Sequence, residues 1–172
     1  KTTRTVGLPF SESFIRDRIL AADALDGLNE EARDVLLVMI NTGARPSEIL
    51  GCAQDAWQLA CGVPHLDISR QIPRVLKTQT AQRLIPLLGV SLDAARRIAR
   101  RGGIGRYADK AYAWSATVNK YLTENGLRET AKHTAYSLRH SFEDRLTEAG
   151  TDDRIRAELM GHKYGRPDYG RG

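Results

Sequence analysis

The chain has 172 residues, 41% of them apolar, and a formal net charge of +5 from 26 basic and 21 acidic side chains. This length suffices for one domain with a substantial core, and the mild positive charge is compatible with a polyanionic partner without requiring one. Cys52 and Cys61 lie outside any CxxC pattern, no apolar run reaches about 18 residues, and none of signal-peptide length follows the start of the chain. We therefore expect a cytoplasmic protein without membrane contact, metal site or disulfide framework.

The first part of the chain predicts two helices. Ser11 is a suitable N-cap for a helix whose apolar side chains recur at helical spacing, namely Phe14, Ile15, Ile19, Leu20 and Ala24. Residues 30–40 form the second predicted helix. Its later half is apolar on every side, which a helix tolerates only when protein surrounds it. We expect this helix to lie at the centre of the core.

The middle of the chain predicts a short helix followed by a small sheet. Pro46 begins the helix at its first position and Gly51 ends it. Short segments broken by glycine and proline follow. Residues 65–69, 74–77 and 83–87 are predicted to form antiparallel strands, the last two joined by a turn at 78–81.

Helices resume in the last part of the chain, at residues 91–100, 115–125, 137–149 and 152–160. Gly126, Gly150 and Gly161 follow three of these helices at places that favour a left-handed residue. The predicted fold is therefore mainly α with a small antiparallel β-sheet (α+β), in one domain that spans residues 1–172.

A first candidate site lies at the start of the short helix. Arg45 directly precedes Pro46, so its guanidinium lies beside free backbone N–H groups, a place that suits an anion. Glu48, three residues on, can accept a hydrogen bond from the cap N–H or brace the arginine. Taken alone, the same residues also fit a helix start with a solvated arginine.

A second candidate lies on helix 137–149. A buried stripe is expected there from Leu138, Phe142, Leu146 and Ala149. Arg139 borders this stripe, so we expect its stem to pack and its guanidinium to point outward, where it can contact two phosphate oxygens. Tyr136 and His140 lie beside it on one face at i, i+4 spacing. A solvated basic face would show the same pattern.

Three more residues could complete a site for phosphoryl chemistry. Lys77 ends a predicted strand, where a lysine can reach a DNA groove or give up a proton, although most such lysines only solubilise an edge strand. His162 follows the helix-ending Gly161, which leaves its ring free to hydrogen-bond a phosphate oxygen. Tyr169 lies in a loop near the end; its phenol, with an ordinary pKa of about 10, needs cations and a route for its proton to act as a nucleophile. Tyr164 is the rival nucleophile.

The order of these motifs resembles the catalytic domain of tyrosine recombinases, the phage integrase family. The resemblance rests on Thr-Gly-Ala-Arg-Pro-Ser-Glu at 42–48, Leu-Arg-His at 138–140, Leu-Met-Gly-His at 159–162 and the late tyrosine, and it spans residues 8–169. It implies the DNA breaking-rejoining fold. It also implies a site-specific recombinase of the prophage integrase type, which cleaves and rejoins DNA through a 3′-phosphotyrosine intermediate without metal, ATP or another cofactor.

The resemblance also implies a role for each candidate residue. Arg45 and Arg139 would clamp the scissile phosphate, Lys77 would protonate the leaving 5′ oxygen, His162 would stabilise the transition state, Tyr169 would attack, and Glu48 would support the first arginine; Tyr136 and His140 are secondary candidates. Two features depart from the family pattern. Tyr136 stands where the family usually has histidine or lysine, and it cannot offer an imidazolium. Tyr169 follows His162 by seven residues, a shorter interval than in many members.

Double-stranded DNA is the partner that the resemblance implies, with further recombinase protomers that form a tetramer on DNA in the full-length protein. Family members usually carry an N-terminal helical domain that closes around DNA; we expect that domain to lie outside this chain. The chain alone is then expected to be monomeric, weakly active, and to bind DNA weakly and salt-sensitively. Two alternatives remain: a type IB topoisomerase, which relaxes supercoils with a similar constellation, and a non-catalytic DNA-binding module, in which no bond breaks.

Overall fold

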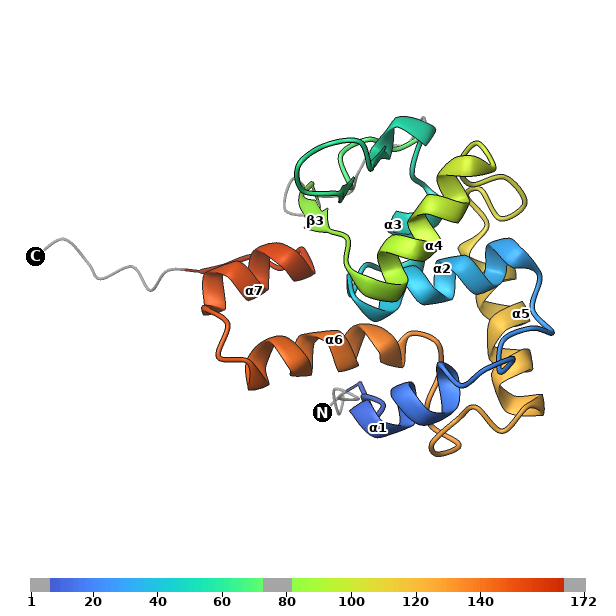
Figure 1. Ribbon diagram of the computed structural model, residues 1–172. Coiled ribbons are helices and arrows are strands. Elements are labelled where there is room, and N and C mark those ends of the chain that lie inside the picture. The colour runs from blue at the N-terminus through green and yellow to red at the C-terminus, as the bar shows by residue number, and fades with distance from the viewer. Residues whose placement is uncertain (1–6, 73–81, 166–172) are drawn as a thin grey trace, which may run out of the picture.

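The computed structural model describes residues 7–72 and 82–165 (Figure 1). The helices are α1 (Glu12–Phe14), which continues into a π-helical turn (Ile15–Ile19), α2 (Glu30–Ile40), α3 (Pro46–Leu50), a 3-10 turn (Gln54–Ala56), α4 (Gly89–Arg100), α5 (Ala111–Glu124), α6 (Ser137–Glu148) and α7 (Asp153–Met160). The strands are β1 (Trp57–Gln58), β2 (His65–Asp67) and β3 (Leu84–Pro86). The prediction of a mainly α domain with a small antiparallel sheet is confirmed.

Helix α2 forms the centre of the core, as its sequence predicts. The Asn29 side chain caps its N-terminus by accepting a hydrogen bond from the Ala32 N–H, and α2 packs against α3, α4, α5 and α6. Its last turn is joined to α4 by Ser91, whose hydroxyl lies 2.8 Å from the Leu37 carbonyl oxygen and 2.9 Å from that of Val38. These hydrogen bonds attach the last turn of α2 to α4, directly before the chain turns toward α3.

The sheet has the order β1-β2-β3, and both pairings are antiparallel. Leu66 of β2 lies opposite Trp57 on one side and Ile85 on the other, and these three side chains are buried. The predicted strands at 65–69 and 83–87 are confirmed in position but are shorter than expected. Strand β1 was not predicted, and the predicted strand 74–77 and turn 78–81 lie outside the described residues.

Several helix ends can be compared with the prediction. Ser11 caps the first helix by accepting a hydrogen bond from the Phe14 N–H, but helical structure stops at Ile19, so Ala24 lies beyond it. Helix α5 begins at Ala111 instead of residue 115. Gly126, Gly150 and Gly161 have the predicted left-handed conformation, with φ of 65°, 71° and 67°.

Helix α6 departs most from its predicted pattern. Leu138 is buried as expected, but Phe142 and Leu146 are only partly buried and Ala149 is exposed, whereas Arg139 is buried. The reason is visible in Figure 1: the first half of α6 lies below α2, while its second half extends past the core toward α7. Apolar spacing alone could not show where the covering elements end.

Helix α7 lies at one end of the molecule, close to β3 and to the end of α6 (Figure 1). Asp152 caps it by accepting hydrogen bonds from the N–H groups of Arg154 and Ile155. Within residues 7–72 and 82–165, none of the helices combines the length and the apolar character that a bilayer crossing requires.

Candidate functional site

The first candidate arginine is fixed by the turn between α2 and α3. Thr42 Oγ1 donates to the Val38 carbonyl at 2.6 Å, and Gly43 takes a left-handed φ of 61°, which aims the chain into α3. Arg45 is the N-cap of α3, as predicted. Its side chain is 32% exposed, so the Arg45 side chain is only partly buried and remains accessible to a ligand.

Glu48 makes both of the contacts predicted for it. Its Oε2 accepts from the Arg45 backbone N–H at 2.9 Å, and its Oε1 accepts from Arg45 Nη1 at 3.0 Å. The sequence did not indicate that Glu48 also holds a second arginine. Arg83 Nη1 and Nη2 each donate to one Glu48 oxygen at 2.9 Å, and the Arg83 side chain is only 1% exposed.

The charge state of Glu48 follows from these partners. Burial raises its pKa, but the hydrogen bonds and charge of Arg83, together with those of Arg45, outweigh burial and hold the pKa below its usual value. Glu48 is therefore an ionised, buried carboxylate shared by two guanidinium groups. Stability that depends on it is lost as pH falls through this lowered pKa.

Arg139 lies deeper than predicted. Its residue is 3% exposed, its Nη1 donates to the Gly43 carbonyl at 2.7 Å, and its Nη2 donates to the Met160 carbonyl at 2.6 Å. The prediction of an outward guanidinium is wrong, because carbonyls at the ends of α2 and α7 draw the group inward. Burial and the nearby charge of Arg45 lower the pKa of Arg139, yet a guanidinium stays charged at neutral pH. Its hydrogen-bond partners among the described residues are all neutral.

His162 leaves α7 through the left-handed Gly161, as predicted, but its ring is already engaged. Its Nε2 lies 3.1 Å from Arg139 Nη2, and since an arginine can only donate, Nε2 is the acceptor and the proton is on Nδ1. Nδ1 faces Glu143 Oε1 at 3.7 Å. Burial, followed by the charge of Arg139, lowers the pKa of His162, and Glu143 opposes them. The imidazole is therefore neutral at pH 7.

The structure thus brings three predicted residues together from three separate helices. Arg45, Arg139 and His162 lie close enough that the charges of both arginines lower the pKa of the histidine. Around Glu48, the three guanidinium groups of Arg45, Arg83 and Arg139 outnumber one carboxylate and leave two positive charges. A partly buried surplus of cations at the start of α3 is suited to binding a phosphate-type anion.

Other predicted residues lie apart from this group or outside the described chain. Lys77 and Tyr169 fall among the residues that the structure does not describe, and the rival Tyr164 is exposed. Tyr136 and His140 pack on each other with ring centroids 5.4 Å apart. They line a separate cavity of about 500 Å³ with Gly7, although Tyr136 is near enough to Arg139 to affect its pKa.

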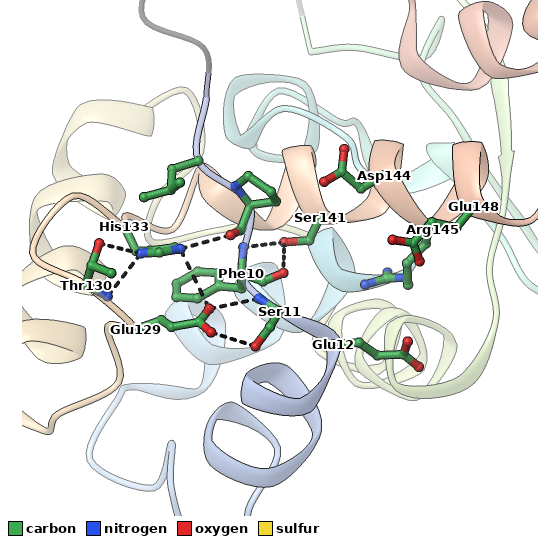
Figure 2. A pocket seen from close by; sticks show the side chains of 12 residues that line it. Phe10, Ser11, Glu12, Glu129, Thr130, His133, Ser141, Asp144, Arg145 and Glu148 are labelled. Atoms are coloured by element: carbon green, nitrogen blue, oxygen red, sulfur yellow. Dashed lines mark hydrogen bonds and ion pairs between the residues drawn. The ribbon is translucent and has the colours of Figure 1, made fainter.

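A second cavity beside α6 is lined by the N-terminal segment (Figure 2). It measures about 410 Å³ and lies between residues 8–12, the loop 129–133 and α6. The Thr130 N–H donates to His133 Nδ1 at 3.0 Å, so His133 Nε2 donates to the Pro9 carbonyl at 2.9 Å. Ser141 Oγ accepts from the Phe10 N–H at 2.9 Å. These contacts tie the N-terminal segment to the helix that carries Arg139, and they account for the buried His133.

Comparison with known proteins connects this geometry to one family. No family model matches the sequence. The chain is 28% identical over 165 residues to tyrosine recombinase XerD of Corynebacterium glutamicum, covering 85% of this chain and 49% of that protein. It is 24% identical over 176 residues to tyrosine recombinase XerC of Syntrophus aciditrophicus, covering 91% of this chain and 52% of that protein. The chain spans about half the length of the curated relatives it matches.

Solved structures show the same fold. The integrase of mycobacterium phage Brujita superposes with a TM-score of 0.68 at 23% identity over 94% of this chain and 52% of that chain. XerA recombinase gives a TM-score of 0.68 at 14% identity, covering 95% and 58% of the two chains. The Tn1549 transposon integrase, solved with transposon right end DNA, gives 0.63 at 20% identity, covering 92% and 59%.

The sequence is thus similar to tyrosine recombinases, and the fold is the one seen in solved tyrosine recombinases and integrases. The resemblance inferred from the motifs is confirmed, and so is the catalytic-domain fold of the family. Arg83 and Glu143 are site residues that the motifs did not reveal. The sequence does carry one signal for Arg83, which is an arginine directly before an apolar strand. A buried arginine needs an acidic partner, and Glu48 is such a residue.

Proposed function

We propose that this chain is the catalytic domain of a site-specific DNA recombinase that cleaves and rejoins DNA through a 3′-phosphotyrosine intermediate. The observation that carries this proposal is the meeting of Arg45, Arg139 and His162 from three helices, with a buried guanidinium at its centre. Arg139 is separated from Arg45 by 94 residues and from His162 by 23. The fold brings these distant residues together, and the hydrogen bonds among them do not neutralise all of their positive charge.

The chemistry needs little more than position and charge. Arg45 and Arg139 would each hold a non-bridging oxygen of the scissile phosphate, and His162 would contact a further oxygen. Tyr169 would attack phosphorus as its phenolic proton passes to solvent, the bond to the 5′ oxygen would break, and Lys77 would supply the proton to that oxygen. The phosphotyrosine keeps the bond energy, so a new 5′ hydroxyl can rejoin the strand without ATP.

Double-stranded DNA is the proposed partner. The Tn1549 integrase was solved with transposon DNA and XerH recombinase with a palindromic difH substrate, and both share this fold. We extend this to a DNA complex of further recombinase protomers in the cytoplasm. An N-terminal DNA-clamping domain outside the present chain is part of the same proposal, because this chain spans about half of its relatives.

A covalent-capture assay on a nicked duplex tests the function. When the cleaved strand carries a nick just downstream of the cut, the short fragment with the free 5′ hydroxyl diffuses away. The strand can then not be rejoined, and the phosphotyrosine accumulates. We expect the unmodified chain to give a protein–DNA band that survives denaturation, Tyr169→Phe to give none while still binding DNA, and Tyr164→Phe to behave as the unmodified chain.

Two outcomes would overturn the proposal in different ways. A covalent band that persists in Tyr169→Phe would move the nucleophile elsewhere, with Tyr164 next. No band from the unmodified chain on any duplex that it binds would leave a DNA-binding module without chemistry. Relaxation of supercoiled plasmid without strand exchange between paired sites would favour a topoisomerase.

A further inference from the structure

Arg83 connects the two halves of the candidate site. It grips Glu48 of α3 with two hydrogen bonds of 2.9 Å, and its Nε donates to the Leu159 carbonyl in the last turn of α7 at 2.8 Å. Leu159 lies three residues before His162. One buried side chain from the head of β3 therefore fixes both the helix that Arg45 caps and the turn that presents His162.

The contact with α7 is also a close packing of surfaces. A Cβ added to Gly161 would lie 2.6 Å from Arg83 Nη1 and 2.9 Å from Arg83 Cζ. The backbone of the turn at Gly161 thus rests directly against the guanidinium, and a side chain there would displace it. Gly150 has the same left-handed conformation, but nothing lies within 4 Å of its added Cβ. An alanine at 161 would therefore have to push the Arg83 guanidinium aside, whereas an alanine at 150 would meet nothing.

The Glu48 carboxylate divides its hydrogen bonds between the two arginines. Oε1 accepts from Arg45 Nη1 and Arg83 Nη1, and Oε2 accepts from the Arg45 backbone N–H and Arg83 Nη2. Arg83 therefore offsets the negative charge that would otherwise act on Arg45 alone. An unshared carboxylate in this low-dielectric place would hold the Arg45 guanidinium to itself and cancel the charge that a phosphate needs.

We infer that Arg83 is a positioning residue for the proposed phosphate site. It locks α3 to the Gly161–His162 turn and balances Glu48, so that Arg45 keeps donors and positive charge for the DNA phosphate. Arg83 itself is buried against Glu48 and Leu159 and acts through Arg45 and His162. This role rests on the proposed function, since it concerns how the same site is held ready.

The test compares Arg83→Gln with the double variant Arg83→Gln/Glu48→Gln in the nicked-duplex assay. We expect Arg83→Gln to slow single-turnover formation of the covalent complex by about 10- to 100-fold, by analogy with the loss of residues that orient metal ligands. The affinity for DNA should fall by much less, because contacts along the phosphate backbone of the DNA dominate it. In the double variant, no uncompensated carboxylate holds Arg45, so we expect the rate to recover at least about fivefold over Arg83→Gln.

A purely structural role for Arg83 predicts a different pattern. Arg83→Gln takes the buried arginine partner away from the buried Glu48 carboxylate and can unfold the chain, but the double variant has a neutral pair in its place and keeps the test valid. Thermal melting shows how much of each variant is folded. Arg97→Gln, at the other buried carboxylate Asp34, is the matched control and should leave the rate unchanged.

Two results would overturn the inference. One is an Arg83→Gln rate equal to that of the unmodified chain. The other is a folded double variant that stays as slow as Arg83→Gln, which would show that balancing Glu48 is not what Arg83 provides. Both require a covalent band from the unmodified chain, so they are distinct from a failure of the proposed function, in which no chain gives a band.

Discussion

Two buried carboxylates in this molecule each bind several arginines, yet they differ in where the surplus charge goes. Asp34 of α2 is fully buried and accepts from Arg97 at 2.9 Å and from Arg101 at 2.7 Å. The side chains of those two arginines remain about one third exposed to solvent. At Glu48, by contrast, Arg83 is buried, and the neighbouring Arg139 is buried without any carboxylate in hydrogen-bond contact among the described residues.

The comparison separates an ion cluster whose surplus charge faces water from one that is suited to binding an anion. Around Asp34 the extra positive charge lies at the surface, where water screens it. Near Glu48, Arg45 is exposed to the same degree, but the charge of Arg139 lies in the interior, where its hydrogen-bond partners among the described residues are carbonyl groups and an imidazole. A buried cation without an anionic partner is stabilised strongly when a ligand brings an anion next to it.

The largest expected effect is on cleavage, from removal of the buried cation. Arg139→Ala should reduce single-turnover formation of the covalent complex by on the order of 100-fold or more, because it removes a charge from the transition state. Arg97→Ala in the Asp34 cluster should leave that rate unchanged. Equal losses in the two variants would erase the distinction between the clusters.

The next effect is on stability and concerns the other cluster. Asp34→Ala should lower the free energy of unfolding by about 2 kcal/mol, less than the ~3–5 kcal/mol of a fully buried broken pair, since Arg97 and Arg101 can turn toward water. Urea denaturation measures it. The cleavage rate of the folded variant should match that of the unmodified chain, and a large drop in that rate would show that the Asp34 cluster belongs to the site.

A pair of glycine substitutions separates backbone strain from the contact with Arg83. Gly161→Ala and Gly150→Ala both force alanine into a left-handed conformation, at a cost of about 1–2 kcal/mol each. Only Gly161→Ala also displaces Arg83, so it alone should slow cleavage, by about tenfold. Denaturation curves and cleavage rates of the two variants supply the test. A similar slowing by both would place the effect in the backbone.

The smallest effect is the pH response of His162. Its pKa in the folded chain is lowered from the usual 6.5, first by burial and then by Arg139, so below about pH 6.5 the unfolded chain binds more protons. Stability should therefore fall slightly as pH drops through this window, and His162→Gln should remove that fall. Proton NMR titration of the His162 ring should also give a lower pKa in Glu143→Gln, because Glu143 opposes the shift. A higher pKa in that variant would contradict the assigned contacts.

Local signals determined which parts of the fold could be predicted. Helix α2 was predicted with its observed bounds, and its apolar later half placed it at the centre of the core; α3 was predicted because proline and glycine bracket it. The order of the motifs singled out Arg45, Arg139 and His162, and the structure brings these three residues together. Helical periodicity, however, placed Arg139 at a solvent edge, and this was wrong.

Tertiary contacts decided what the sequence could not show. The Gly43 carbonyl that draws Arg139 inward lies 96 residues away in sequence. The partners of Arg83, Glu48 and Leu159, lie 35 and 76 residues away, so the pattern at 83–87 shows a charged residue beside a strand but not which residues it binds. Such long-range contacts depend on how α3, β3 and α7 pack, which no spacing within one segment records.

The central claim is that Arg45, Arg139 and His162 form one site for a DNA phosphate, and NMR of their side chains during a DNA titration tests it most directly. The guanidinium resonances of both arginines and the ring resonances of His162 would be followed as nicked duplex is added. We predict that all three shift along a single saturation curve and that the pKa of His162 rises when the phosphate binds. Shifts confined to surface arginines, with Arg139 and His162 unchanged at saturation, would contradict it.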